Sequence, residues 1–321
     1  MLKYIFKRLI QMFTVLFVVS ILVFFLTHFI GDPVDMLVPE NATMKEIESA
    51  KIRLGLDKPL PVQYAIFLND VVHGDFGKSY TYGKPAMALI VERIPATMEI
   101  VLVAAILVLV IAIPLGVYAG AYPKRRLSKF IMTGSILGIS LPSFWVGMML
   151  IYVFAVIFKI FPASGRGDTV VVFGIKTSLF APGGLKYIIL PAITLALSNL
   201  ATTIRLTRSG IIENMKQDYI KFARSKGVTS RKVLFGHALK NALIPVITIF
   251  GMSLGGMIAF TTITETIFAW PGIGKLLIDA IGKADRPIIV AYLMATACMF
   301  VVINFVVDLL YTFIDPRIEL R

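Results

Sequence analysis

Long apolar runs that are almost free of charge recur along this chain of 321 residues, and they constrain its fold more than any other feature. A segment needs about 18 to 20 mostly apolar residues to cross the hydrocarbon core of a bilayer. Because that core offers no hydrogen-bond partners, a continuous run of this kind satisfies its backbone as a helix. The sequence therefore predicts an all-α polytopic membrane protein with six transmembrane helices, at residues 9–30, 100–121, 130–161, 187–204, 242–262 and 287–311.

The distribution of Lys and Arg predicts the orientation of these spans. Eighteen of the 32 Lys and Arg residues lie in the N-terminal segment, in the loops after the second and fourth spans, and in the C-terminal tail. Short loops rich in Lys and Arg stay on the cytoplasmic side of a membrane. Six spans then place both termini in the cytoplasm, and the chain is predicted to lie in the cytoplasmic (inner) membrane, surrounded by lipid. The same distribution accounts for the net charge of +13 without a nucleic acid partner.

The spans divide the chain into three segments. Residues 1–30 comprise a short cytoplasmic segment and the first transmembrane helix. Residues 31–96 are polar and rich in acids, and they are predicted to form an external insertion. Residues 97–321 contain a core of five helices, with a cytoplasmic loop at 206–241. The amphipathic segment at 265–286 is too short to span, so it is predicted to be a re-entrant element on the outer side.

The cytoplasmic loop has the character of a soluble protein. Its periodicity predicts a first helix over about 209–226, with Tyr219, Phe222 and Ala223 on one face. Gly227 follows, and glycine readily adopts the left-handed conformation that ends helices. A second helix then leads into the fifth span. This arrangement predicts a compact basic knob that a cytosolic partner can bind.

Two of the spans carry residues that are unusual in a transmembrane helix. The third span contains Pro142, which lacks a backbone donor and is expected to kink or break the helix beside Phe144 and Trp145. A packing kink and a gate are both open interpretations of this segment. In the sixth span, Asn304 and Asp308 lie on one helical face. A structural pairing of Asp308 with a basic residue is favoured over a role in translocation.

Residues for catalysis or metal binding are sparse. The three histidines are far apart in the sequence, and a single cysteine, Cys298, excludes both a disulfide within the chain and a thiolate cluster. Gly77-Lys78-Ser79 lacks the earlier glycine that a phosphate-binding loop requires. The spans contain too few titratable groups for a proton relay. The sequence therefore predicts a transporter that is not an enzyme, binds no metal or other cofactor, and takes its energy from a partner.

Several motifs, in the same order, resemble those of one transporter family. Ala223 and Gly227 match the second alanine and the glycine of the Glu-Ala-Ala…Gly coupling motif of ABC importer permeases, while Lys221 and Phe222 replace the first two residues. Further similarity lies in the segments SLPSFWVG at 140–147, WPGIG at 270–274, and DPR at 315–317. The chain resembles the B-type permease subunit of binding-protein-dependent importers for dipeptides, oligopeptides or nickel.

The resemblance implies a fold, a set of partners and site residues. It implies the type I ABC importer transmembrane fold, a homologous second permease subunit, one or two cytosolic ABC ATPases that bind ATP and Mg, and an external substrate-binding protein. Transport of di- or oligopeptides by alternating access is then expected. The residues implied for ATPase coupling are Tyr219, Phe222, Ala223 and Gly227; those for a gate or pathway are Pro142, Phe144, Trp145, Asn304 and Asp308; and those on the binding-protein side are Glu265, Trp270, Pro271 and Gly272.

Other functions remain open at this point. Nickel or an oligosaccharide is an alternative cargo for the same kind of permease. A stand-alone channel or facilitator, with the loop as a regulatory docking site, is the alternative from a different class.

Overall fold

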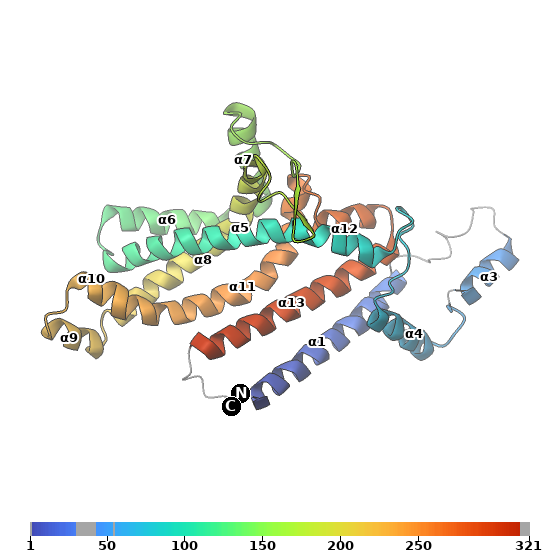
Figure 1. Ribbon diagram of the computed structural model, residues 1–321, viewed down its shortest axis with the longest axis horizontal. Helices are drawn as coiled ribbons and strands as arrows, with labels where there is room; N and C mark the ends of the chain where they lie inside the picture. The colour runs from blue at the N-terminus through green and yellow to red at the C-terminus, as the bar shows by residue number, and fades with distance from the viewer. Residues whose placement is uncertain (1, 30–42, 54, 315–321) are drawn as a thin grey trace. The chain divides into compact units, whose positions relative to one another are not determined.

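The computed structural model describes residues 2–29, 43–53 and 55–314, and almost all of its regular structure is helical (Figure 1). The α-helices are α1 Leu2–Phe29, α3 Met44–Arg53, α4 Leu60–His73, α5 Ala86–Ala121, α6 Arg126–Ser140, α7 Ser143–Leu150, α8 Gly184–Asn214, α9 Asp218–Ser225, α10 Ser230–Lys232, α11 Leu239–Ile267, α12 Ile273–Gly282 and α13 Arg286–Ile314. Two π-helical segments, η1 Ile151–Ile157 and η2 Val233–Ala238, continue α7 and α10. The strands β1 Val170–Val172 and β2 Ile175–Thr177 form the only sheet among these residues.

The predicted spans correspond to helices of sufficient length. Five helical segments are long and apolar enough to cross a membrane: Ile5–Leu26, Ala86–Ala121, Gly184–Asn214, Ser230–Ile267 and Arg286–Leu309. The third span along the chain corresponds to a bent pair, α6 with α7 and η1, and counting this pair as one span gives six. The protein is thus an all-α membrane protein whose third span is broken rather than straight.

The break in the third span lies at Pro142, as predicted. Helix α6 ends at Ser140, α7 begins at Ser143, and the two directions differ by 107°. Leu141 and Pro142 both have extended backbone angles. This follows from the proline ring, which disfavours the helical conformation in the residue before it.

Helix α5 begins earlier than the apolar run suggests. The run that predicts the second span starts at residue 100, whereas α5 starts at Ala86 and continues through Pro95. Charged residues in its first part, such as Glu92 and Glu99, mask the start of the helix in the hydropathy pattern. The predicted boundary between external insertion and helical core, at 96/97, falls within this helix.

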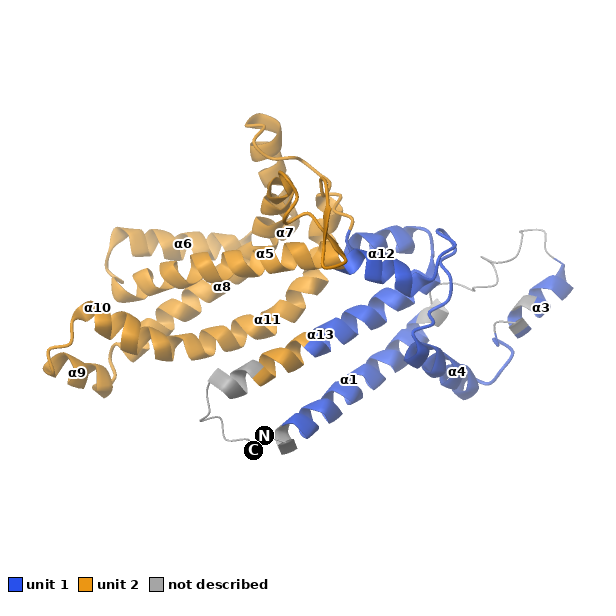
Figure 2. Ribbon diagram, in the orientation of Figure 1, with its two compact units in different colours: residues 1–94, 272–302 blue, residues 95–271, 303–321 orange. Residues whose placement is uncertain are grey.

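The chain divides into two compact units, which Figure 2 colours separately. Unit 1 comprises Met1–Ile94 and Gly272–Val302, and unit 2 comprises Pro95–Pro271 and Ile303–Arg321. In unit 1 the short amphipathic helix α12 packs its apolar face on the first turns of α5 and of α13. Helix α12 lies within the amphipathic segment 265–286, and its apolar face is buried within the protein. The buried residues of this core include Leu89, Ile90, Ile273, Leu276, Ile288 and Tyr292.

A buried acid fixes the loop that precedes α5. Asp285, in the turn between α12 and α13, is fully buried and accepts a hydrogen bond of 2.5 Å from the Ser79 hydroxyl. The backbone N–H groups of Tyr80 and Thr81 also donate to its carboxylate, at 3.2 and 3.0 Å. Three donors satisfy this carboxylate, as a buried charge requires. The loop at 79–81 is therefore held against the start of α13.

In unit 2, α8 packs against α6, α7 and α11. Its contact with α5 depends on two glycines. A Cβ atom at Gly116 would lie 2.5 Å from Cβ of Thr207, and one at Gly120 would lie 2.7 Å from Cβ of Ile211. Small residues at these positions let the two helix backbones approach closely, which is a common means of packing helices in membranes.

A β-hairpin between α7 and α8 was not predicted from the sequence. Strands β1 and β2 pair antiparallel around a two-residue turn, Phe173-Gly174, in which both residues have positive φ. This backbone suits the twist of a tight hairpin. The signal in the sequence is the β-branched run Val170–Val172 followed by Gly174. The Gly- and Pro-rich surroundings had suggested only an external loop.

Candidate functional site

The candidate site is the helical knob between α8 and α11, defined as residues 215–240 and seen at one end of unit 2 in Figure 1. It consists of α9, the turn at Gly227, α10 and η2. The predicted helix–turn–helix is confirmed, with one correction. Helix α8 runs on to Asn214 and α9 begins only at Asp218, so the predicted continuous helix over 209–226 is wrong.

Tyr219 ties the knob to the helices on either side. Its hydroxyl donates to Oδ1 of Asn214 at 2.6 Å and accepts from Nδ2 of Asn241 at 3.0 Å. Asn214 is the last residue of α8, and Asn241 lies in the first turn of α11. Tyr219 therefore links the end of one transmembrane helix to the beginning of the next.

An apolar cluster fills the inside of the knob. Ala223 is only 8% exposed and packs with Ile220 of its own helix and with Val233 and Ala238 of η2. Ala223 is among the residues implied for ATPase coupling, and its role there stays a prediction. Its small size is explained by packing within the chain, and the face of α9 that remains outside carries Tyr219 and Phe222.

Gly227 adopts the left-handed conformation that the sequence predicts, with φ of +77°. Its N–H donates to the carbonyl of Arg224 at 2.9 Å, and the N–H of Val228 reaches back to the carbonyl of Ala223 at 3.2 Å. No atom lies within 4 Å of a Cβ built at this glycine. The backbone conformation, and not lack of space, is therefore what requires glycine here.

The outer surface of α9 combines an aromatic ring with charge. Phe222 is 61% exposed, and the ammonium of Lys226 lies 4.5 Å from the centre of its ring. Lys221 forms an exposed ion pair of 2.8 Å with Asp218. This hydrogen bond lowers the pKa of the Asp218 carboxyl, so the pair stays charged at neutral pH. Aromatic side chains are enriched where proteins bind one another, so the exposed Phe222 is a candidate contact for a partner.

We expect Ala223→Leu to destabilise the knob. The larger side chain must enter the packed cluster with Ile220 and Val233, and overpacking of this kind costs about 1–3 kcal/mol. Thermal unfolding of the purified chain measures the effect. Arg224→Leu is the matched control, because Arg224 is exposed on the same helix. Equal melting temperatures for the two variants would contradict the buried position of Ala223.

The residues predicted to face an external binding protein occupy different environments. Glu265 is fully buried and accepts a hydrogen bond of 2.6 Å from the Thr97 hydroxyl. Trp270 is also fully buried, and its indole N–H donates to the carbonyl of Ala96 at 2.8 Å. Both side chains fasten the end of α11 to α5, and their place on the binding-protein side stays a prediction. Pro271 is exposed, and Gly272 is the N-cap residue of α12.

The predicted gate residues lie where the sequence placed them. Phe144 and Trp145 follow the break at Pro142 in α7, and both are exposed within this chain. Asn304 and Asp308 lie one turn apart in α13, and both are half-buried. Their role in a pathway stays a prediction.

A buried ion pair near the outer end of α5 was not predicted from the sequence. Glu99 accepts hydrogen bonds from Nε and Nη2 of Arg166 at 3.1 and 2.7 Å. It also accepts from the backbone N–H and the hydroxyl of Ser178, at 2.9 and 2.7 Å. The pair fastens the external segment around the hairpin to α5. The sequence signal for this ion pair was the charge of Glu99 at the edge of an apolar stretch. The predicted second span began one residue later, at residue 100, and so left Glu99 out.

The comparisons with known proteins agree along the whole chain. The family described as "Binding-protein-dependent transport system inner membrane component" matches residues 112–320, and its N-terminal companion family matches residues 1–101. The oligopeptide transport system permease protein AppB of Bacillus subtilis is 37% identical over 99% of this chain and 100% of its own length. The di/tripeptide transport system permease protein DppB of Pseudomonas aeruginosa is also 37% identical, over 99% of both chains.

A solved structure supports the fold. A chain of the inward-facing MetNI methionine ABC transporter aligns with a TM-score of 0.55 over 71% of this chain and 97% of that chain, at 15% sequence identity. The fold is therefore that of a type I ABC importer transmembrane subunit. Together with the apolar helices, the family places the chain in the cytoplasmic membrane as a multi-pass protein. This chain belongs to the family of inner membrane components of binding-protein-dependent transport systems, the permease subunits of ABC importers.

Proposed function

We propose that this chain is the permease subunit of an importer that moves di- or oligopeptides into the cell. The observation that carries the proposal is the 37% identity to an oligopeptide permease and a di/tripeptide permease along 99% of the chain. A nickel or oligosaccharide permease remains the alternative within the same family. The similarity to the methionine transporter supports the fold alone, because only 15% of the residues are identical.

The proposed partners follow from the family's dependence on a binding protein. A homologous second permease subunit completes the pathway, one or two cytosolic ATPases bind ATP and Mg, and an external binding protein delivers the substrate. This chain itself binds no cofactor and hydrolyses nothing on this proposal. Alternating access then results when closure of the ATPases changes the arrangement of the transmembrane helices.

The knob at 215–240 is the proposed point of coupling to an ATPase. Phe222 supplies an exposed aromatic anchor, and Tyr219 fixes that surface to the ends of α8 and α11 through two hydrogen bonds. The turn at Gly227 sets the direction of α9. Ala223 contributes indirectly, by allowing α9 to pack closely on η2.

The broken third span is the proposed gate region. The bend of 107° at Pro142 orients Phe144 and Trp145 differently from a straight helix. Asn304 and Asp308 are the polar residues proposed to lie along the pathway. A packing role for the same residues is the alternative.

The test is the uptake of a labelled dipeptide, and separately of nickel, in cells that lack this chain and in the same cells with it restored. We expect restoration to return ATP-dependent dipeptide uptake. Return of nickel uptake alone would keep the coupling proposal and change the cargo. Transport by the purified chain alone in vesicles would instead support a stand-alone channel.

A further inference from the structure

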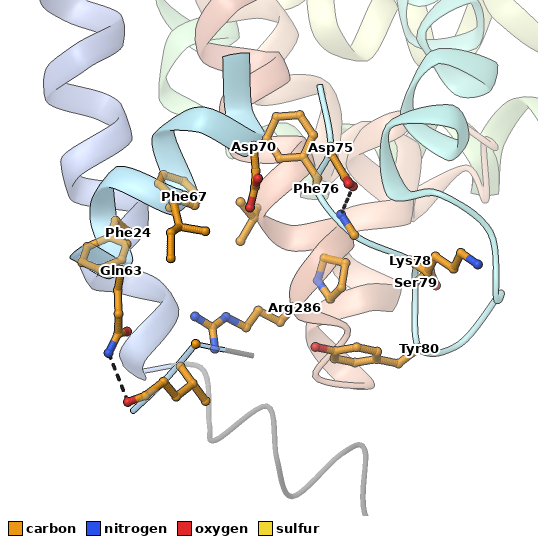
Figure 3. A pocket seen from close by; sticks show the side chains of 16 residues that line it. Phe24, Gln63, Phe67, Asp70, Asp75, Phe76, Lys78, Ser79, Tyr80 and Arg286 are labelled. Atoms are coloured by element: carbon orange, nitrogen blue, oxygen red, sulfur yellow. Dashed lines mark hydrogen bonds between the residues drawn. The ribbon is translucent and has the colours of Figure 1, made fainter. Parts of the chain in front are cut away.

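A cavity of about 640 Å³ lies in unit 1, between α1, α4, the loop before α5 and the start of α13 (Figure 3). Its volume falls within the range of small-molecule sites, about 300–1,000 Å³. All of its lining residues belong to the same unit. Neither the proposed coupling knob nor the proposed gate region includes it.

The walls of this cavity are apolar and aromatic. Phe24 of α1 and Phe67 of α4 contribute rings whose centres lie 5.7 Å apart, and Phe76 and Val290 also line the cavity. The polar side chains among the lining residues decide what the cavity binds; they are Gln63, Asp70, Asp75, Lys78, Ser79, Tyr80 and Arg286. Binding sites for small molecules commonly combine an apolar lining with a few polar groups in this way.

Opposite charges face the same space. Figure 3 shows the carboxylate of Asp70 reaching in from α4 and the guanidinium of Arg286 reaching in from the start of α13. Asp70 is half-buried, and its carboxylate has no hydrogen bond or ion pair among the residues that the structure describes. A guanidinium has five N–H donors, so Arg286 can bind an anionic group and still keep another partner.

The position of Asp70 in its helix disfavours a negative charge. It lies in the last turn of α4, where the helix dipole disfavours a negative charge. The helix ends at Gly74, which is left-handed, and the N–H of Asp75 donates to the carbonyl of Asp70 at 2.9 Å. The backbone at Asp70 is therefore fixed, while its carboxylate remains available to bind a cation. Residues that break a local rule of stability are often functional.

The second charge is also held in place. Arg286 follows Asp285, whose carboxylate is bound by Ser79, Tyr80 and Thr81. Tyr80 itself lines the cavity, and burial raises the pKa of its hydroxyl, so it stays a hydrogen-bond donor at neutral pH. Arg286 at the start of α13 and Tyr80 in the loop before α5 thus present two donors for an anionic group.

We infer that this cavity binds a small zwitterion, with its ammonium group at Asp70 and its carboxylate or phosphate at Arg286. Two sources supply this chemistry: a short peptide with free termini, and the headgroup of phosphatidylethanolamine. The peptide source rests on the proposed function, because the cavity then lies on the side from which peptide arrives. The lipid source is independent of it, since α1 and α13 are membrane spans.

The experiment measures binding to the purified full-length chain in detergent, by isothermal calorimetry. The probes are alanyl-alanine against its N-acetylated, C-amidated form, and dihexanoyl phosphatidylethanolamine against the corresponding phosphatidylcholine, whose methylated nitrogen donates no hydrogen bond. We expect at least one zwitterion to bind and its blocked partner to bind at least about tenfold more weakly, because one charged hydrogen bond is worth about that much.

Two variants complete the test. Asp70→Asn is expected to weaken the zwitterion about tenfold, since it removes the charge that faces the ammonium. Lys78→Gln is the matched control: Lys78 also lines the cavity, but in Figure 3 its ammonium extends away from Asp70 and Arg286, so binding is expected to change less than about twofold.

Each outcome decides a separate point. Binding of the dipeptide alone assigns the site to peptide, and binding of phosphatidylethanolamine alone assigns it to lipid. Equal binding of a zwitterion and its blocked partner, or equal binding by wild type and Asp70→Asn, overturns the inference. If the proposed function is wrong, cells with this chain restored show no peptide uptake. The binding of phosphatidylethanolamine to the cavity is unaffected in that case.

Discussion

Glu99→Ala is expected to cause a large loss of stability. Four donor atoms, two from Arg166 and two from Ser178, converge on the Glu99 carboxylate. Its side chain is 4% exposed and that of Arg166 is 12% exposed. Removing one partner of a buried ion pair leaves the other charge unpaired, which costs about 3–5 kcal/mol. For a chain of 321 residues, we expect the melting temperature to fall by roughly 4–8 °C.

The control for this prediction is an ion pair in a more exposed position. Lys275 and Asp279 lie one turn apart on α12 at 2.9 Å, and both side chains are partly exposed. Lys275→Ala is expected to cost at most about 1 kcal/mol, because solvent screens such pairs. Thermal unfolding in detergent measures both variants. If Glu99→Ala melts within about 2 °C of Lys275→Ala (roughly the shift given by 1 kcal/mol), the buried pair does not hold the external segment.

Gly227→Val is expected to give the largest loss of transport. Valine is β-branched and strongly disfavours positive φ, so the turn at +77° must rearrange. The left-handed conformation costs an ordinary residue about 1–2 kcal/mol, and relief of that strain redirects α9 and its exposed Phe222. We expect uptake of labelled dipeptide to fall at least about tenfold, while the amount of chain in the membrane stays unchanged.

The variant Gly227→Asn distinguishes two reasons for glycine at this position: the left-handed backbone conformation and the lack of a side chain. Asparagine visits the left-handed region far more readily than valine, yet it adds a larger polar side chain than glycine. Since nothing lies within 4 Å of a Cβ at this position, the asparagine variant has room. We expect it to keep most of the transport activity. Wild-type uptake by the valine variant, or equal loss in both variants, would count against the conformational explanation.

The features that could be predicted from the sequence are those set by local chemistry. Pro142 breaks its helix because a proline ring acts on its own neighbours, whatever surrounds them. Gly227 ends α9 for a similar reason, since the turn needs a backbone that only glycine adopts easily. The six spans follow from the length of the apolar runs, because the bilayer sets that length.

The features that were missed depend on tertiary contacts. Ala223 shares a helical face with Phe222 and Tyr219 in a simple projection, but packing against Val233 decides that it points inward. Glu99 lies 67 residues from Arg166 and 79 from Ser178. No local pattern predicts that these three residues meet. The partners of Glu265 and Trp270 are similarly distant, at Thr97 and Ala96.

The length of helix α8 lets it connect the two faces of the membrane mechanically. Its 31 residues, with Pro191 among them, form one helix of about 46 Å, at 1.5 Å per residue. At its inner end Asn214 accepts from Tyr219, and at its outer end Gly184 lies directly against the carbonyl of Ser178, which Glu99 holds. If the helix moves as one body, a tilt of about 10° around its middle moves its two ends by about 4 Å in opposite directions. We expect a displacement of the cytoplasmic end to reach the opposite face of the membrane in the reverse direction.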